Sequence, residues 1–234
     1  MRNHAGVPYV LIGGQAVNYW AEHYLAAEPE LRKQVPFTSG DIDFRGNRVD
    51  VRHIAGQLGL PAVFPDPVSL TALAGAIPFK IGTQPSNIEI VRLIPGVSTA
   101  TVDDLAIGAE LSGQQIRVLD PISLLHCKMN LALTVSQNDR QDVPHLRILI
   151  LCVRGFLRDA LQTVEAGHAP AKGWLGAVNR LMKLAKSTQG RQAARKFSLR
   201  WLEILPLAEI GVAKNDKIIS FRENQMVRAF GLDK

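Results

Sequence analysis

The sequence has little of what marks membrane, secreted or disulfide-rich proteins. Its 234 residues include only two cysteines, Cys127 and Cys152, which form neither a Cys-x-x-Cys pair nor a zinc-ligand pattern. Two such thiols are typical of buried, reduced cysteines in a cytoplasmic protein. The longest strongly apolar run, ILILCV at 148–153, is far shorter than the roughly 20 residues that span a bilayer. The first residues show no secretory signal, so we expect a cytoplasmic protein without membrane association.

Acidic residues are scarce in the last part of the chain. Residues 171–234 carry 13 Lys and Arg against 5 Asp and Glu, a net of +8, whereas residues 1–170 carry 14 against 16, a net of −2. Together these sums give the formal net charge of +6. A basic segment behind a near-neutral one suits a module that holds a polyanion such as nucleic acid. A solvated basic helical surface is the alternative.

Hydrophobic patterning divides the chain near residue 120. Before that point, short apolar segments bounded by glycine and proline alternate with amphipathic ones, which predicts an α/β domain with four or five strands. We expect strands at 8–14, 40–46, 86–94 and 113–120, shorter strand candidates at 62–64 and 78–82, and helices at 15–34, 47–60 and 101–111. Asn47 is the expected N-cap of the second helix and Gly59 its expected end. From Pro121 onward the pattern is helical, over 121–137, 142–166, 171–188 and 190–212. The predicted domains are therefore an α/β domain, 1–120, and a helical domain, 121–234.

The first predicted strand ends in two glycines, Gly13 and Gly14, directly before a helix. Glycine lets the backbone approach a ligand closely, and the exposed N–H groups of a following helix can bind phosphate. A Gly-Gly turn that only joins a strand to a helix is the more common case. This turn therefore becomes informative only through the residues that accompany it.

Two aspartates, Asp41 and Asp43, alternate with apolar residues on a predicted strand. Alternation places both carboxylates on one face, while Ile42 points to the other. Neighbouring carboxylates repel each other, and Mg²⁺, which prefers oxygen ligands, is the natural cation to neutralise them. The alternative is an edge strand whose polar face meets solvent.

Glu89 lies between two isoleucines on a later predicted strand. A glutamate inside a strand is disfavoured unless it is exposed or paired. If the sheet sets Glu89 beside Asp41 and Asp43, the three carboxylates form a cluster that can hold two metal ions. A solvent-exposed surface glutamate is the alternative.

These residues together resemble the nucleotidyltransferase superfamily, the DNA polymerase beta-like fold. The resemblance rests on an apolar strand ending in Gly-Gly, an Asp-x-Asp strand preceded by a serine, and a third strand carboxylate, here Gly13, Gly14, Ser39, Asp41, Asp43 and Glu89. It implies a mixed sheet with flanking helices. The 26 residues between Gly14 and Asp41 exceed the family's usual gap and imply an extended helix or an inserted loop around 25–37.

The segment that follows, IRVLDPISLLHCKMNLAL and NDRQDVPHLRIL, looks like that of the abortive-infection (AbiEii-type) toxin nucleotidyltransferases. The matching positions are Lys128, which would steady the β- and γ-phosphates of the substrate, and Asp142, which would hold Lys128 or contact the substrate. His145 stands where that family often has a second acid. We interpret His126 and His145 as structural histidines.

The resemblance implies an enzyme that transfers a nucleoside monophosphate from an NTP to an acceptor hydroxyl and releases pyrophosphate. Asp41, Asp43 and Glu89 would bind two Mg²⁺ ions, with Glu89 alternatively acting as general base, while Gly13, Gly14, Ser39 and Lys128 would bind the nucleotide. The basic tail favours an RNA acceptor such as tRNA, and the toxin-like segment suggests a cognate antitoxin. The alternatives are a small-molecule acceptor, as in aminoglycoside-modifying relatives, or a non-catalytic protein that binds nucleotide or RNA.

Overall fold

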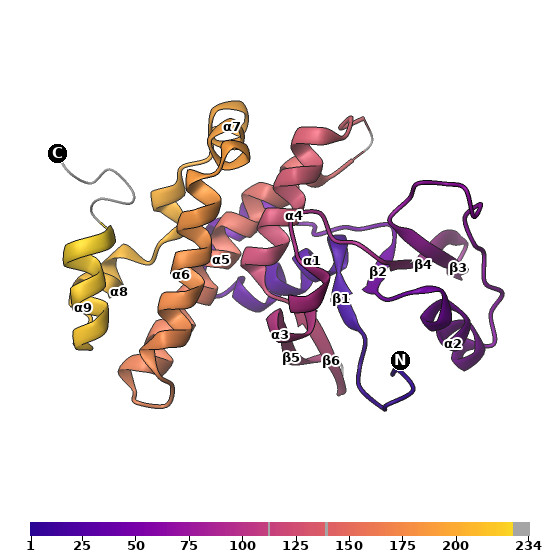
Figure 1. Ribbon diagram of the computed structural model, residues 1–234, viewed down its shortest axis with the longest axis horizontal. Coiled ribbons are helices and arrows are strands. Elements are labelled where there is room, and N and C mark those ends of the chain that lie inside the picture. Colours follow the sequence, from indigo (N-terminus) through magenta and orange to yellow (C-terminus); the bar gives the residue numbers. More distant parts are fainter. Residues whose placement is uncertain (112, 139, 227–234) are drawn as a thin grey trace. The chain divides into compact units, whose positions relative to one another are not determined.

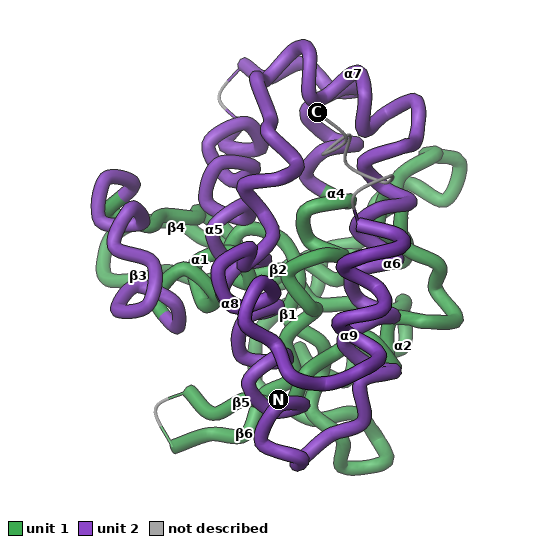
Figure 2. The backbone as a smooth tube through the Cα atoms, turned by 90° about the vertical axis from the view of Figure 1, so that its left-hand side faces the viewer, with its two compact units in different colours: residues 1–22, 35–127 green, residues 23–34, 128–234 purple. Residues whose placement is uncertain are grey.

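The computed structural model describes residues 1–111, 113–138 and 140–226. The chain forms two compact units, each described by itself (Figure 2). Unit 1 comprises Met1–Glu22 and Val35–Cys127, and unit 2 comprises His23–Gln34 and Lys128–Lys234. The segment 23–34, from inside the first predicted domain, thus belongs to the same unit as the C-terminal helices.

Unit 1 is built on a six-stranded mixed sheet with the strand order β3-β4-β2-β1-β6-β5 (Figure 1). The strands are β1 (Val10–Ile12), β2 (Ile42–Arg45), β3 (Leu73–Ile81), β4 (Gln84–Val91), β5 (Ala106–Leu111) and β6 (Gln114–Leu119). The pairs β2–β4 and β1–β6 are parallel, and the pairs β1–β2, β3–β4 and β5–β6 are antiparallel. The predicted mixed sheet with flanking helices is therefore confirmed, with six strands in place of four or five.

Three helices accompany these strands, and a fourth follows them: α1 (Gly13–Tyr24), α2 (Arg48–Leu58), α3 (Val102–Leu105) and α4 (Pro121–Thr134). Asn47 caps α2 as predicted, with its side chain accepting from the N–H groups of Val49 and Asp50, and Gly59 ends the helix in the left-handed conformation. Trp20 of α1 donates its indole N–H to the Leu119 carbonyl at 2.8 Å, which fixes α1 against β6.

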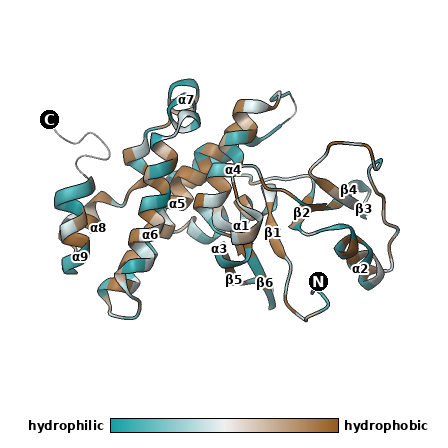
Figure 3. Ribbon diagram, viewed as in Figure 1, coloured by the Kyte–Doolittle hydropathy of each residue, from teal (hydrophilic) through white to brown (hydrophobic). Residues whose placement is uncertain are grey.

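The core of unit 1 lies between α2 and one face of the sheet. Val51 and Ile54 of α2 are fully buried against Ile77, Ile88 and Ile90, and Ile42 and Phe44 of β2 pack against this cluster. Figure 3 shows β1 as a hydrophobic strand, and all three of its residues are buried. Since Ile42 and Phe44 face this core, alternation turns Asp43 to the other face of the sheet.

Two predicted helices of the sequence differ in the structure. Residues 101–111 were expected to be one helix, but only Val102–Leu105 is helical and 106–111 form β5. Alanine and glutamate there favour helix locally, but antiparallel pairing with β6 decides the conformation. The predicted helix 15–34 ends at Tyr24, and a 3-10 helix, η1 (Pro29–Gln34), follows within the long gap between Gly14 and Asp41.

Two strand predictions also change. The candidate at 78–82 is the end of the nine-residue β3, and the candidate at 62–64 forms only an isolated bridge from Val63 to Ala76. β2, predicted with the edge-strand alternative, lies between β4 and β1. The edge-strand alternative for Asp41 and Asp43 is therefore wrong.

All regular secondary structure in the described residues of unit 2 is helical. Its further elements are α5 (Asp142–Glu165), α6 (Ala171–Lys186), α7 (Thr188–Phe197), η3 (Trp201–Ile204), α8 (Leu207–Val212), α9 (Asp216–Phe221) and a π-helical turn, η4 (Arg222–Met226). The predicted helix 190–212 is broken because Ser198 is left-handed (φ 56°) and because Pro206, which precedes α8, cannot continue a helix. Leu146, Leu149, Val153 and Leu157 form the buried stripe of α5. Trp174 of α6 donates to the Leu157 carbonyl at 2.9 Å.

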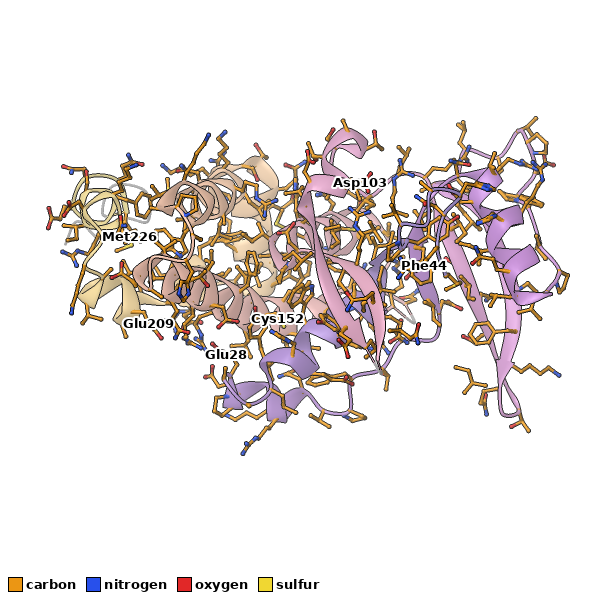
Figure 4. The ribbon with its side chains drawn as sticks, turned by 90° about the horizontal axis from the view of Figure 1, so that it is seen from below. Glu28, Phe44, Asp103, Cys152, Glu209 and Met226 are labelled. Atoms are coloured by element: carbon orange, nitrogen blue, oxygen red, sulfur yellow. The ribbon has the colours of Figure 1, made fainter. Side chains whose placement is uncertain are left out.

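A buried ion cluster holds the segment 23–34 within unit 2. Glu28 is 1% exposed and pairs with Arg154 and Arg158 of α5, and Arg158 also pairs with Glu209. Glu28 and Glu209 are labelled in Figure 4. Charge-assisted bonds of this kind satisfy a buried carboxylate. Among the described residues, no helix is long and apolar enough to span a membrane.

Candidate functional site

Gly13 makes room for the carboxylate of Asp43. The backbone of Gly13 is left-handed (φ +66°), and a Cβ placed on it would lie 1.8 Å from Oδ2 of Asp43. The antiparallel pairing of Ile12 with Asp43 brings the two residues together. Only glycine meets both demands, the positive φ and the close approach. The Gly-Gly turn and the Asp-x-Asp motif, far apart in the sequence, therefore form one local structure.

Glu89 lies next to Asp43 across the parallel pair β2–β4, where the two residues are register partners. Directly opposite residues project from the same face of a sheet, so the two carboxyl groups share one side. The pKa of Glu89 is raised, first by burial and then by the negative charges of Asp43 and Asp41. The structure thus brings Asp41, Asp43 and Glu89 into one electrostatically coupled group.

Asp41 directly precedes β2, and Asn87 fixes its side chain. Oδ1 of Asp41 accepts hydrogen bonds from the backbone N–H and from the side-chain amide of Asn87, each at 3.1 Å. Ser86 adds a hydrogen bond from its hydroxyl to the Gly40 carbonyl at 2.6 Å. These contacts with β4 hold the carboxylate in one orientation without neutralising its charge.

Ser39 is turned toward the backbone. Its hydroxyl donates to the Asp41 carbonyl at 3.2 Å, and its own carbonyl accepts from the Gln15 side chain at 3.1 Å. Gln15 follows Gly14 in the first turn of α1, so it ties the loop before Asp41 to the Gly-Gly turn. Gln15 and Asn87 lie outside the motifs that predicted the site. The signal for Asn87 was its place two residues before Glu89 on the same strand face.

The cluster of Asp41, Asp43 and Glu89, called the carboxylate group below, suits Mg²⁺ by its chemistry. Within residues 1–111, 113–138 and 140–226, no three His, Cys, Asp or Glu side chains form a preassembled metal-ligand set. Mg²⁺ does not need one, because it is usually held by one or two carboxylates together with substrate phosphates. The repulsion that raises the pKa of Glu89 is the kind that a bound cation relieves.

Lys128 and Asp142 form a buried ion pair in unit 2. Nζ of Lys128 lies 2.9 Å from Oδ1 of Asp142, and Nε of Arg140 lies 2.6 Å from Oδ2 of the same carboxylate. Burial raises the pKa of Asp142, but the charges and hydrogen bonds of Lys128 and Arg140 outweigh it and leave that pKa below its ordinary value. Asp142 therefore holds Lys128 in place. His145, one turn further along α5, is buried.

Comparison with known proteins finds similarity only at the level of solved structures, and that similarity is distant. No family model matches the chain, and no curated protein matches it. Among solved structures, the chain is similar to an antigenic nucleotidyltransferase-like protein from Paracoccidioides brasiliensis, with 13% identity and a TM-score of 0.40. The match covers 62% of this chain and 66% of that one. A function therefore has to be inferred from the site itself.

Proposed function

We propose that the chain is a Mg²⁺-dependent nucleotidyltransferase that transfers a nucleoside monophosphate from an NTP to an acceptor hydroxyl. The observation that carries the proposal is the contact of Gly13 with the Asp43 carboxylate, with Glu89 beside it. A strand-to-helix turn that can bind phosphate thereby adjoins carboxylates that can bind a metal ion. Phosphoryl transfer needs both, because its catalysis consists mostly of positioning and charge stabilisation.

Asp41, Asp43 and Glu89 would hold two Mg²⁺ ions. Bound there, Mg²⁺ supplies charge neutralisation for the triphosphate and for the attacking and leaving oxygens. The backbone N–H groups that follow Gly13 and Gly14 at the start of α1 bind phosphate oxygens, and Ser39 positions Asp41 through its carbonyl. Asn87 fixes the orientation of Asp41.

Glu89 is the general base in this proposal when it does not ligate metal. An efficient base has a pKa near the working pH, and the pKa of Glu89 is shifted upward toward that range. It would take the proton of the acceptor hydroxyl as the new phosphorus–oxygen bond forms and pyrophosphate leaves.

Lys128, in unit 2, is proposed as a residue that binds phosphate of the nucleotide. Two cations, Lys128 and Arg140, share the single carboxylate of Asp142. The cluster therefore keeps a net positive charge that can attract phosphate.

RNA is the proposed acceptor, with the 3′ end of tRNA as its first candidate. Residues 166–202 contain eight Lys and Arg and no Asp or Glu. Six basic side chains are exposed on α6 and α7, and four of them, Lys183, Lys186, Arg191 and Arg195, lie within eight residues of Ser187, the residue between the two helices. Arg191 also donates to the Lys186 carbonyl, which joins the start of α7 to the end of α6. We call these four residues the α6–α7 basic face. A face of this kind suits a phosphate backbone and disfavours a cationic small molecule such as an aminoglycoside.

A transfer assay tests the proposal. The protein is incubated with Mg²⁺, each α-labelled NTP in turn, and total cellular RNA, beside Asp43→Asn and the control Asp104→Asn, which alters an exposed carboxylate of unit 1. We expect label in a tRNA-sized band for the wild type and the control, and none for Asp43→Asn.

Other results of the transfer assay would favour a small-molecule acceptor or a non-catalytic binding protein. Label that stays out of RNA while NTP binding persists would direct the search to small hydroxylated acceptors. Failure there as well would favour a nucleotide- or RNA-binding protein without turnover. Equal transfer by the wild type and Asp43→Asn would contradict the assigned site. A cognate antitoxin, also expected from the toxin-like segment, would be sought as a protein that suppresses the transfer.

A further inference from the structure

A second polar cleft lies in unit 1, beside Tyr9 and Val10 at the start of β1, whereas Gly13 follows the end of that strand. It has a volume of about 170 Å³. Its polar side chains come from the residues before β1, the end of β2, the start of α2, the η2–α3 segment and β6, and include Asn3, Arg45, Asp50, Thr99, Asp103 and Arg117. Ligand pockets for whole small molecules usually exceed about 300 Å³. This cleft therefore suits a single small group.

Two guanidinium groups enter the cleft from the strands on either side of β1. Arg117 of β6 is the register partner of Val10, and Arg45 of β2 follows Phe44, the partner of Leu11. Arg117 is already engaged, since Nη1 lies 2.8 Å from Oδ1 of Asp103 and Nη2 donates to the Asp103 carbonyl at 2.8 Å. Asp103 is labelled in Figure 4.

Arg45, unlike Arg117, forms no ion pair with a described carboxylate. Its one hydrogen bond runs from Nη1 to the Gly46 carbonyl at 3.1 Å, and its Nε is buried without a hydrogen-bond partner in the described part of the chain. A buried charged donor without a partner is unfavourable, which makes Arg45 the group that a ligand would satisfy.

The carboxylates around the cleft are occupied by other donors. Oδ1 of Asp50 accepts from the Tyr9 hydroxyl at 3.1 Å, and Oδ2 accepts from the Asn47 backbone N–H at 2.8 Å. Burial, the charge of Asp50 and this hydrogen bond raise the pKa of Tyr9, so its hydroxyl keeps its proton. Asp103 is bound to Arg117. Both Asp50 oxygens are therefore engaged by neutral donors and Asp103 by Arg117, which leaves Arg45 without a carboxylate partner among the described residues.

We propose that this cleft binds a phosphate-sized oxyanion through Arg45. The planar guanidinium offers Nε and Nη donors that match two oxygens of a phosphate at once. Two further donors line the cleft: the Thr99 hydroxyl, and the amide of Asn3, whose Oδ1 accepts from Ala5 and Val7 N–H groups at 3.0 Å each. The anion is free phosphate or the phosphoryl end of a larger molecule. This site is separate from the carboxylate group and requires no nucleotidyl transfer.

The test is a titration of the full chain with inorganic phosphate, without NTP or Mg²⁺, followed by NMR at the Arg45 Nε–H. The signal is assigned by its absence in Arg45→Lys. We expect a saturable shift for the wild type and affinity at least about tenfold weaker in Arg45→Lys, because lysine offers no fork of donors. Lys80→Gln removes an exposed cation of the same unit and should bind as the wild type does.

Further titrations distinguish free phosphate from a phosphate ester, and binding in this cleft from binding at the carboxylate group. Equal affinity for phosphate and glycerol 3-phosphate would assign a free anion, and tighter binding of the ester would assign the phosphoryl end of a larger ligand. Asp43→Asn should retain phosphate binding, since loss there would place the anion at the carboxylate group and overturn the proposal. No saturable shift at Arg45 Nε–H, or unchanged affinity in Arg45→Lys, would also overturn it. If Arg45→Lys does not fold, Thr99→Ala, which changes an exposed residue, should weaken binding.

Discussion

Replacing Gly13 with alanine tests the arrangement on which the candidate site depends. Gly13 has φ +66°, and the added Cβ would fall 1.8 Å from Oδ2 of Asp43. An L-residue in the left-handed region costs about 1–2 kcal/mol, and turning the Asp43 side chain aside costs about 0.5–1.5 kcal/mol more. We therefore expect Gly13→Ala to lower the free energy of unfolding by about 2–3 kcal/mol.

Gly59 supplies a matched control within the same unit. It has φ +64°, nearly the value of Gly13, but no atom lies within 4 Å of an added Cβ. Gly59→Ala therefore isolates the backbone strain and should cost about 1–2 kcal/mol. The difference between the two variants, measured by urea denaturation, reports the conflict with Asp43.

A double-mutant cycle completes the test. Asp43→Ala removes the carboxylate that the new methyl group would meet, so the combined variant should be more stable than the sum of the single effects, by about 1 kcal/mol. Equal costs for Gly13→Ala and Gly59→Ala, together with strict additivity in the cycle, would refute the proposed contact. The site derived from it would then have to be abandoned.

Three further predictions concern charge. Because the folded state raises the pKa of Glu89 above its ordinary 4.5, ionising it opposes folding, so Glu89→Gln should gain stability over the wild type as the pH rises above 4.5; a pH-independent difference in urea denaturation would contradict this. Lys128→Met leaves the buried Asp142 with Arg140 alone and should cost about 2 kcal/mol. Since the pKa of Asp142 lies below its ordinary 3.8, the stability cost of Lys128→Met should shrink as the pH falls below 3.8. The control Lys172→Met changes an exposed lysine and should cost under about 0.5 kcal/mol. Replacing the four residues of the α6–α7 basic face with glutamate should abolish RNA binding in filter assays and leave NTP binding unchanged. The control Lys214→Glu/Lys217→Glu should leave both RNA binding and NTP binding unchanged. Equal loss of RNA binding in the two variants would mean that overall charge, not this face, attracts RNA.

Local patterns predicted the elements that local chemistry determines. Asn47 and Gly59 gave both ends of α2, because capping depends on a few neighbouring residues. Asp41, Asp43 and Glu89 could be selected because charged residues interrupt apolar strands. Strand β5 was missed because its pairing with β6 is a tertiary effect that its own composition opposes.

The finer parts of the site depend on register, which the sequence does not reveal. Only the pairing of Ile12 with Asp43 explains why position 13 must be glycine. Asn87 bonds Asp41 because β2 and β4 run parallel in one particular register. Arg45 belongs to no motif, and its unsatisfied Nε becomes visible only when the surrounding donors and acceptors are assigned.

The placement of residues 23–34 limits how this protein can be divided for study. A fragment that ends at residue 120 would keep Glu28 but lose Arg154 and Arg158, its buried partners. It would also expose Leu31, which is fully buried, and leave an apolar side chain and the unpaired Glu28 carboxylate on the α/β half. Conversely, a C-terminal fragment would contain Arg154 without Glu28 and Glu30, and Arg158 with Glu209 alone. Biochemistry on the isolated α/β half should therefore begin with fragments that also lack 23–34, joined across that gap by a short flexible linker.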